Sequence, residues 1–284
     1  MRFVTTPAEL DALAPFSADG SAGSRAVVMT MGALHEGHLA LVRAAREAND
    51  QVVATIFVNP LQFDDANDLQ RYPRTLEADA QLLEDAGVDV LFAPNVETVY
   101  PGGDPVVRVS AGTLGDVLEG AHRPGHFDGV LTVVLKLLNL TRPDRAYFGQ
   151  KDAQQLLAIR AMVRDLNVPV DVIGVPTQRD PDGLALSSRN VHLSASERAS
   201  ALSLSRSLEA VTAALELGEP LADALTDGRR VLDATEGVQV DYLEAMNPAD
   251  AQPLPAGYRG DAVIAVAARV GATRLIDNVP VRIG

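Results

Sequence analysis

Two histidines and two glycines follow a short apolar run near the start of the chain. We predict a strand over 26–29 and a helix over 37–49, so these residues form the turn between the two. The turn reads Met31, Gly32, Ala33, Leu34, His35, Glu36, Gly37 and His38. The N-terminus of a helix offers unpaired N–H groups and the positive end of a dipole, both of which favour phosphate. Glycines let the backbone approach such a ligand closely.

The spacing of the histidines adds side-chain donors to this turn. His35 and His38 are three residues apart, so they lie on one face once a helix has begun. Two imidazoles there can donate to phosphate oxygens whose negative charge grows in a transition state. Zinc-binding helices use His-x-x-x-His instead, so the spacing does not favour a zinc site. We predict a phosphate site, with structural capping of the helix by the histidines as the alternative.

A second group of donors follows a loop later in the chain. Its residues are Leu186, Ser187, Ser188 and Arg189, after an Asp-Pro-Asp-Gly sequence at 180–183. Arginine offers a bidentate fork and serine a neutral hydroxyl, so together they can hold a polyphosphate. Ser187 could instead satisfy backbone groups of its own loop. Paired with the histidine turn, the segment resembles the second of the HIGH and KMSKS elements of the nucleotidyltransferase superfamily.

Polar side chains also follow two further predicted strands. A strand over 145–148 is followed by Gly149, Gln150, Lys151 and Asp152. Gln62 follows a strand over 52–58, and Gln155 lies one helical turn after Lys151. Ligands collect at such carboxyl ends of strands in open α/β sheets. An ammonium group suits phosphate and neutral amides suit a polyhydroxy acid, whereas a salt bridge, a helix cap and ordinary polar roles are the structural alternatives.

The elements that position these residues alternate between strand and helix up to residue 177. Beyond those already given, we predict strands over 88–92 and 170–175 and helices over 75–86, 128–140 and 153–166. Such alternation implies right-handed βαβ units and a parallel sheet. Helices over 194–217 and 221–234 and strands over 238–245, 262–268 and 273–276 follow. We therefore predict an α/β protein, with a Rossmann-like parallel-sheet nucleotide-binding domain over 1–177 and a smaller C-terminal α+β domain over 178–284.

Composition excludes several classes of function. The 284 residues carry a net charge of -14 and include no cysteine, which excludes disulfides, thiolate metal sites and a cysteine nucleophile. The negative charge disfavours nonspecific binding to nucleic acid or to an anionic membrane. The first residues lack the apolar stretch of a signal peptide, and no apolar run approaches the roughly 18 residues of a membrane span. We expect a cytoplasmic protein that acts on small molecules.

Taken together, these motifs resemble those of the pantoate–β-alanine ligase family. The matching segments run in order along nearly the whole chain, at 30–38, 56–63, 72–75, 118–120, 123–127, 151–155, 183–190 and 274–278. The resemblance implies a Rossmann-like ATP-binding domain, a smaller C-terminal lid domain, a homodimer and a need for Mg²⁺. It also implies a two-step reaction. Pantoate attacks the α-phosphate of ATP to give pantoyl adenylate and pyrophosphate, and β-alanine then displaces AMP.

The resemblance also implies a role for each candidate residue. The turn from Met31 to His38 would bind ATP, with His38 as proton donor and both histidines stabilising the α-phosphate transition state. Lys151 would be the third catalytic residue. Further contacts to ATP would come from Gly149, Gln150, Lys151, Asp152, Gln178, Leu186, Ser187, Ser188 and Arg189. Gln62 and Gln155 would hold pantoate, with Gln62 also near β-alanine. Arg123 and His126 match a segment that lines the same cavity.

The chain departs from the family pattern at several positions. Ala78 stands where many members have an acidic residue, which leaves Asp79 as the candidate protein ligand for Mg²⁺. Gln150 replaces the usual glutamate, and Gln178 replaces an apolar residue beside adenine.

Two other functions fit parts of the pattern. A different nucleotidyltransferase would release pyrophosphate but never AMP, and a nucleotide-sensing module would bind ATP and release neither. A tRNA-charging enzyme is disfavoured because the net charge of -14 leaves little basic surface for RNA.

Overall fold

The computed structural model describes residues 1–13, 23–63 and 66–284, which form two compact units. The first unit comprises Met1–Gln150 and Ala158–Pro176, and the second comprises Lys151–Leu157 and Thr177–Gly284. Each unit is described below by itself.

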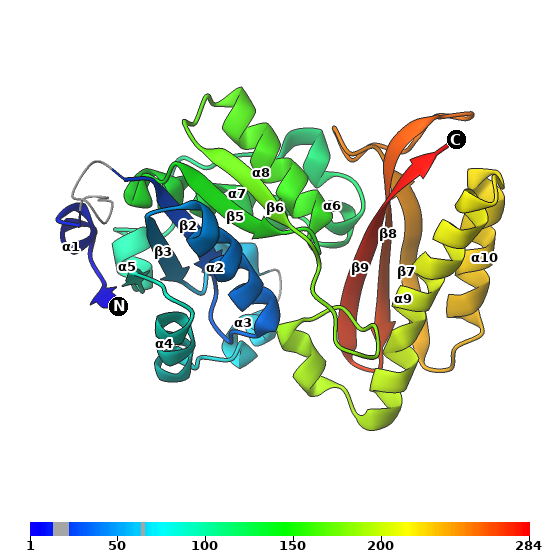
Figure 1. The fold of residues 1–284 in the computed structure, drawn as a ribbon, viewed down its shortest axis with the longest axis horizontal. Coiled ribbons are helices and arrows are strands. Elements are labelled where there is room, and N and C mark those ends of the chain that lie inside the picture. The colour runs from blue at the N-terminus through cyan, green and yellow to red at the C-terminus, as the bar shows by residue number, and fades with distance from the viewer. Residues whose placement is uncertain (14–22, 64–65) are drawn as a thin grey trace. The chain divides into compact units, whose positions relative to one another are not determined.

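A six-stranded parallel sheet forms the centre of the first unit (Figure 1). In spatial order its strands are β1 (Arg2–Val4), β4 (Val90–Phe92), β3 (Gln51–Ile56), β2 (Arg25–Thr30), β5 (Arg145–Gly149) and β6 (Asp171–Val175). Every neighbouring pair runs parallel. The chain proceeds outward in one direction from β2 and in the other from β5, so the strand order reverses between these two. The topology confirms the predicted Rossmann-like sheet.

Helices follow the strands of this unit. They are α1 (Pro7–Asp11), α2 (Glu36–Ala48), α3 (Ala66–Arg71), α4 (Leu76–Asp85), α5 (Val96–Val99), α6 (Glu119–His122) and α7 (His126–Thr141). Helix α8 (Ala153–Asp165) begins in the second unit's segment and continues into the first. Successive residues of β2, such as Val27 and Val28, are fully buried, as expected of a strand covered on both faces. Leu41, Val42 and Ala45 of α2 pack in the core cluster on one face.

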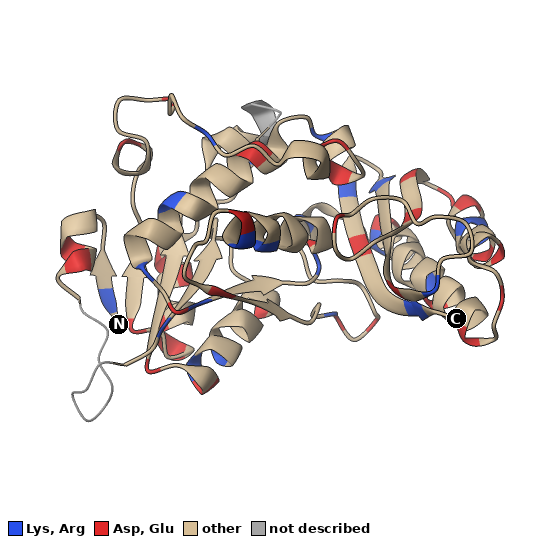
Figure 2. Ribbon diagram, turned by 90° about the horizontal axis from the view of Figure 1, so that it is seen from above, with Lys and Arg blue, Asp and Glu red and all other residues tan. Residues whose placement is uncertain are grey.

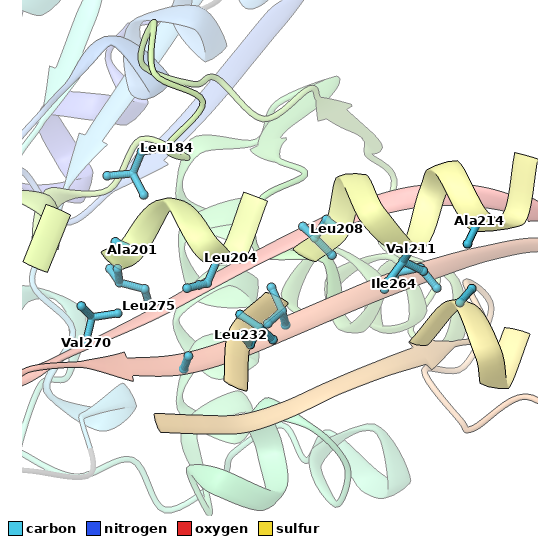
Figure 3. Packing of buried hydrophobic residues seen from close by; sticks show 13 residues of the cluster. Leu184, Ala201, Leu204, Leu208, Val211, Ala214, Leu232, Ile264, Val270 and Leu275 are labelled. Carbon is cyan, nitrogen blue, oxygen red and sulfur yellow. The ribbon is translucent and has the colours of Figure 1, made fainter. Parts of the chain in front are cut away.

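A three-stranded antiparallel sheet and two helices form the second unit. The strands are β7 (Val238–Met246), β8 (Gly260–Val270) and β9 (Thr273–Ile283), with β8 in the middle. Helices α9 (Ala195–Glu216) and α10 (Leu221–Asp233) pack beside them. Figure 3 shows Leu208 and Val211 of α9 with Leu232 of α10 and Ile264 of β8 in one cluster. Each of these four residues is at most 3% exposed. This packing accounts for the predicted α+β character.

Two strands differ from the prediction for identifiable reasons. β1 was not predicted, because three residues at the edge of a sheet are too short to show a periodic pattern. β9 extends to Ile283 rather than ending at 276, and it includes Pro280. Proline lacks an N–H group but is tolerated in an edge strand, which is the position of β9.

The surface and the helices agree with the composition. Figure 2 shows acidic residues on helices and loops of both units. Within the described part of the chain, every helix is too short or too polar to cross a bilayer.

Shortening a core leucine should destabilise the second unit. Leu232 is fully buried, so Leu232→Ala should lower the free energy of unfolding by about 2–5 kcal/mol through lost burial and a cavity. Urea denaturation followed by circular dichroism measures this. Leu217→Ala is the matched control, because Leu217 is 81% exposed and should change stability little. Equal losses in the two variants would contradict the packing described.

Candidate functional site

The histidine turn connects β2 to α2. β2 ends at Thr30, whose hydroxyl donates to Thr55 O at 2.9 Å and accepts from Gly32 N at 3.2 Å. Gly32 (φ +85°) and Ala33 (φ +51°) are both left-handed, a conformation that glycine adopts readily and alanine does not. Helix α2 then begins at Glu36. The turn therefore contains one strained residue that its surroundings must hold in place.

His35 and His38 form a reciprocal cap at the start of α2. Nδ1 of His35, the N-cap residue, accepts from Gly37 N at 3.1 Å, and Nδ1 of His38 accepts from His35 N at 3.3 Å. The ring centroids are 4.1 Å apart. Because each Nδ1 faces a backbone donor, the proton of each neutral ring lies on Nε2. The two histidines therefore cap the helix through Nδ1 and carry a proton on Nε2 at the same time, so the capping alternative is compatible with a donor role.

Asp79 of α4 binds the backbone of the same turn. Its Oδ2 accepts from Ala33 N and its Oδ1 from Leu34 N, both at 2.9 Å. The hydroxyl of Thr75 donates to Oδ2 at 3.0 Å. Asp79 is only 2% exposed. Two of the N–H groups that the sequence led us to expect at a phosphate are therefore bonded to this carboxylate.

These contacts do not fit the Mg²⁺ role expected for Asp79. A protein carboxylate that holds Mg²⁺ also leaves room for water and substrate phosphates around the ion. Both oxygens of Asp79 already accept hydrogen bonds in a buried position, and neighbouring Ala78 has no ligand atom. In the described ranges, no three His, Cys, Asp or Glu side chains gather as a metal site requires. We assign no reaction step to a metal held by this chain.

Gln62 lies beyond the end of β3, in the 3-10 helix Pro60–Gln62. Its carbonyl oxygen is 2.8 Å from Nδ1 of His126 and accepts from Nη2 of Arg123 at 3.3 Å. Nη1 of Arg123 is 3.2 Å from Nε2 of His126. Arginine can only donate, so Nε2 is the acceptor and Nδ1 carries the proton that binds the carbonyl. Arg123 and His126 therefore hold the main chain at Gln62.

A buried set of hydrogen bonds holds the Gln62 amide. Asn59 Nδ2 donates to Gln62 Oε1 and to Gly129 O, both at 3.1 Å, and the Tyr100 hydroxyl donates to Asn59 Oδ1 at 2.7 Å. Burial raises the pKa of Tyr100, so its hydroxyl remains a donor. A Cβ atom at Gly129 would lie 2.2 Å from Leu61 O, so helix α7 touches this turn backbone to backbone. Oε1 of Gln62 is thus held by Asn59, whose own amide is bonded to Gly129 and Tyr100.

The end of β5 lies beside the end of β2 in the sheet. Val28 pairs with Tyr147, and the chain leaves β5 at Gly149. Gln150 N then donates to Val175 O at 2.8 Å. Ligands of open α/β sheets bind where the strand order reverses, which here is between β2 and β5. The histidine turn, Gly149 and Gln150 therefore lie where the strand order reverses, which is the expected place for a ligand of the first unit's sheet.

Three of the expected site residues lie in the shorter segment of the second unit, Lys151–Leu157. Lys151, Asp152 and Gln155 are each partly buried. The Lys151 carbonyl accepts from Asn278 Nδ2 of β9 at 2.7 Å, and the Asp152 carbonyl accepts from Leu156 N at 2.9 Å. The backbone of Lys151 is thus bound to β9 within its own unit.

The second donor segment follows a hairpin over 178–186. Leu186 N donates to the Gln178 carbonyl at 2.9 Å, so the backbone at Gln178 is bonded within the hairpin. Ser187 caps the 3-10 helix Ser188–His192, and its Oγ accepts from Arg189 N at 3.3 Å. The structural role considered for Ser187 is therefore present. Its hydroxyl proton can still be donated.

Arginine–aspartate pairs fix this hairpin within the second unit. Arg179 donates from Nη1 and Nη2 to the two carboxylate oxygens of Asp277, at 2.6 and 2.9 Å. The Asp277 side chain is 3% exposed, so the bidentate pair is shielded from water on that side. Arg198 of α9 contacts Asp180 at 2.7 Å and Asp182 at 2.8 Å. The conformation that presents Ser187 thus depends on residues far along the chain.

The sequence did not single out four residues that support these segments, namely Asn59, Tyr100, Arg179 and Asp277. Asn59 and Asp277 lie inside segments that match the family, which was an available signal. Tyr100 and Arg179 lie outside every matching segment, and their partners are 41 and 98 residues away.

Comparison with known proteins agrees with the resemblance over both units. The family described as pantoate-beta-alanine ligase matches residues 2–280. The pantothenate synthetase of Streptomyces avermitilis is 52% identical over 92% of this chain and 94% of that protein. The solved pantothenate synthetase of Thermus thermophilus has a TM-score of 0.92 and 51% identity, covering 98% of this chain and 99% of that one. The ligase of Francisella tularensis, complexed with beta-gamma ATP and beta-alanine, has a TM-score of 0.79 and 35% identity, with 98% and 97% covered.

Breaking the bidentate pair should loosen the hairpin. Asp277→Asn removes the charge that Arg179 faces and should lower the free energy of unfolding by about 1–3 kcal/mol. Hydrogen exchange read by mass spectrometry should become faster over 178–186. Asp261→Asn is the control, because the Asp261–Arg282 pair at 3.3 Å is exposed on both sides and should contribute little. Unchanged exchange in Asp277→Asn would show that the pair does not hold the hairpin.

Proposed function

Because this chain belongs to the pantoate–β-alanine ligase family and joins pantoate to β-alanine to form pantothenate, we propose that it does so through a pantoyl adenylate made with ATP. A carboxylate does not react with an amine unless its oxygen becomes a leaving group. Attack of the pantoate carboxylate on the α-phosphate breaks the bond to pyrophosphate and forms the mixed anhydride. The neutral amine of β-alanine then attacks the acyl carbon, loses a proton and releases AMP. The Francisella relative's complex with beta-gamma ATP and beta-alanine supports these two ligands.

The observation that carries this proposal is the orientation of the two imidazoles. Their Nδ1 atoms accept backbone N–H groups, so their protons are on Nε2. We propose that both Nε2–H groups donate to the α-phosphate as its charge grows, and that His38 is the proton donor. The pantoate carboxylate is already ionised, so the first step needs no general base. Catalysis then depends on positioning and charge stabilisation.

The remaining contacts to ATP follow from the matching positions. We propose that Lys151 is catalytic and pairs with phosphate as a point charge. Further ATP contacts would come from Met31, Gly32, Glu36, Gly37, Gly149, Gln150, Asp152, Gln178, Leu186, Ser187, Ser188 and Arg189. Ala33 and Leu34 belong to the same turn, but their N–H groups are bonded to Asp79, so their contribution is the shape of the turn.

We propose that Gln62 and Gln155 bind pantoate through neutral amides, with Gln62 also near β-alanine. The fixed amide of Gln62 supports this role, because a preorganised side chain loses little entropy on binding. Arg123 and His126 would act through the Gln62 carbonyl. We propose a homodimer from the family resemblance, and a cytoplasmic location as the sequence led us to expect. Any Mg²⁺ that accompanies ATP would be held by phosphate oxygens.

Pyrophosphate exchange separates this function from its rivals. The purified protein should exchange labelled pyrophosphate into ATP only when pantoate is present, and addition of β-alanine should then release AMP. A nucleotidyltransferase for another acceptor would release pyrophosphate without AMP, and a nucleotide-sensing module would release neither. Exchange that ignores pantoate would overturn the adenylate proposal.

Removing either histidine should lower turnover more than substrate binding. A donor that acts in the transition state contributes roughly 10²–10³-fold to rate, so His35→Ala and His38→Ala should reduce the kcat of exchange by about that factor. The KM for pantoate should change by less than about 3-fold. His122→Ala, an exposed histidine of α6, is the control and should retain full activity. Equal losses in kcat and in pantoate affinity would contradict the transition-state role.

A further inference from the structure

The histidine turn needs an anchor because its backbone is not intrinsically favourable. Ala33 has a φ of +51°, and Gly32 before it has a φ of +85°. A left-handed alanine costs roughly 1 kcal/mol or more unless its surroundings enforce it. The turn directly precedes His35, so any relaxation of its backbone moves the N-cap residue of α2.

The anchor is the carboxylate of Asp79, which makes one hydrogen bond on each oxygen to successive residues of the turn. Ala33 N and Leu34 N each lie 2.9 Å from it. Hydrogen bonds to an ionised acceptor are about twice as strong as neutral ones. The approach is close, because a Cβ atom on Gly32 would lie 3.1 Å from Oδ2. The strained alanine is therefore held by two charge-assisted bonds.

Thr75 provides an independent indication that the position of the Asp79 carboxylate matters. Thr75 occupies the N-cap position of α4, where a threonine hydroxyl ordinarily accepts from the helix backbone. It makes no such capping bond, and its hydroxyl instead donates to Asp79 Oδ2 at 3.0 Å. The Thr75 hydroxyl thus stabilises the Asp79 carboxylate instead of capping α4.

We propose that Asp79 is a positioning residue, which holds the Ala33–Leu34 backbone so that His35 and His38 keep their paired geometry, and that it is not a ligand of Mg²⁺. The inference rests on the proposed role of the histidines in adenylation. Asp79 acts through them because it bonds to the residues immediately before His35.

A double-mutant cycle tests whether Asp79 acts through the histidines. Asp79→Asn replaces one acceptor oxygen by an NH₂ group that faces a backbone N–H, and it should lower the kcat of pantoate-dependent exchange about 10–100-fold. In a His38→Ala background the same change should lower kcat by less than about 3-fold, because the paired geometry of the two rings is already lost there. Glu77→Gln, an exposed charge in the same helical turn, is the control. An equal loss in both backgrounds, or recovery of the rate at raised Mg²⁺, would overturn the proposal.

A milder variant tests the same role if Asp79→Asn fails to fold, and a spectroscopic measurement tests it without activity. If Asp79→Asn does not fold, as judged by thermal melting, Thr75→Val removes only one bond to the carboxylate and should lower kcat about 3–10-fold, again with little effect beside His38→Ala. Ring ¹⁵N shifts of His35 and His38 should show Nε2–H tautomers in the parent chain and a tautomer mixture in the Asp79 or Thr75 variant. Unchanged ring shifts would overturn the positioning role. The ring shifts test the positioning role of Asp79 without any measurement of activity. Absence of pantoate-dependent exchange in the parent chain would contradict the adenylate proposal and leave the positioning role to be judged by the ring shifts.

Discussion

A backbone N–H group that donates to a buried carboxylate is not available to a ligand. In the turn after β2, the carboxylate of Asp79 accepts two such groups. This decides which groups of the element remain for a ligand. A helix N-terminus ordinarily attracts anions through its backbone, whereas here two imidazoles cap the helix and Gly37 N is bonded to His35 Nδ1. Each Nδ1 accepts a backbone N–H group, so the proton of each neutral ring lies on Nε2.

The parallel sheet explains why residues distant in sequence can serve one reaction. The carboxyl ends of β2, β3 and β5 lie at one edge, so the histidine turn, the Asn59–Gln62 turn and Gly149 emerge on the same side of the first unit. The first two of these turns are held by different contacts. Asp79 holds the first, and α7 with Tyr100 and Asn59 holds the second.

The sequence predicted what local pattern determines and missed what long-range contacts determine. Alternating strands and helices revealed the parallel sheet, and the glycines beside His35 and His38 indicated a turn that could bind phosphate. The family resemblance implied Asp79 as a ligand of Mg²⁺. Its bond to the turn was not predicted, because a carboxylate that binds a backbone 45 residues away leaves no periodicity or spacing to detect. The Arg179–Asp277 pair was missed for the same reason. β9 was predicted only to residue 276, whereas it continues through Pro280, which its edge position permits.

Gly129 shows how backbone packing can restrict which residues a position accepts. It lies in the first turn of helix α7, where alanine would normally be the better helix former. A methyl group there would collide with the carbonyl of Leu61, in the turn that carries Gln62. The position therefore admits no other residue unless that turn moves. A residue without a side chain, and with no part in the chemistry, is then as intolerant of substitution as a substrate contact, so mutational scans of this chain should not equate sensitivity with contact to substrate.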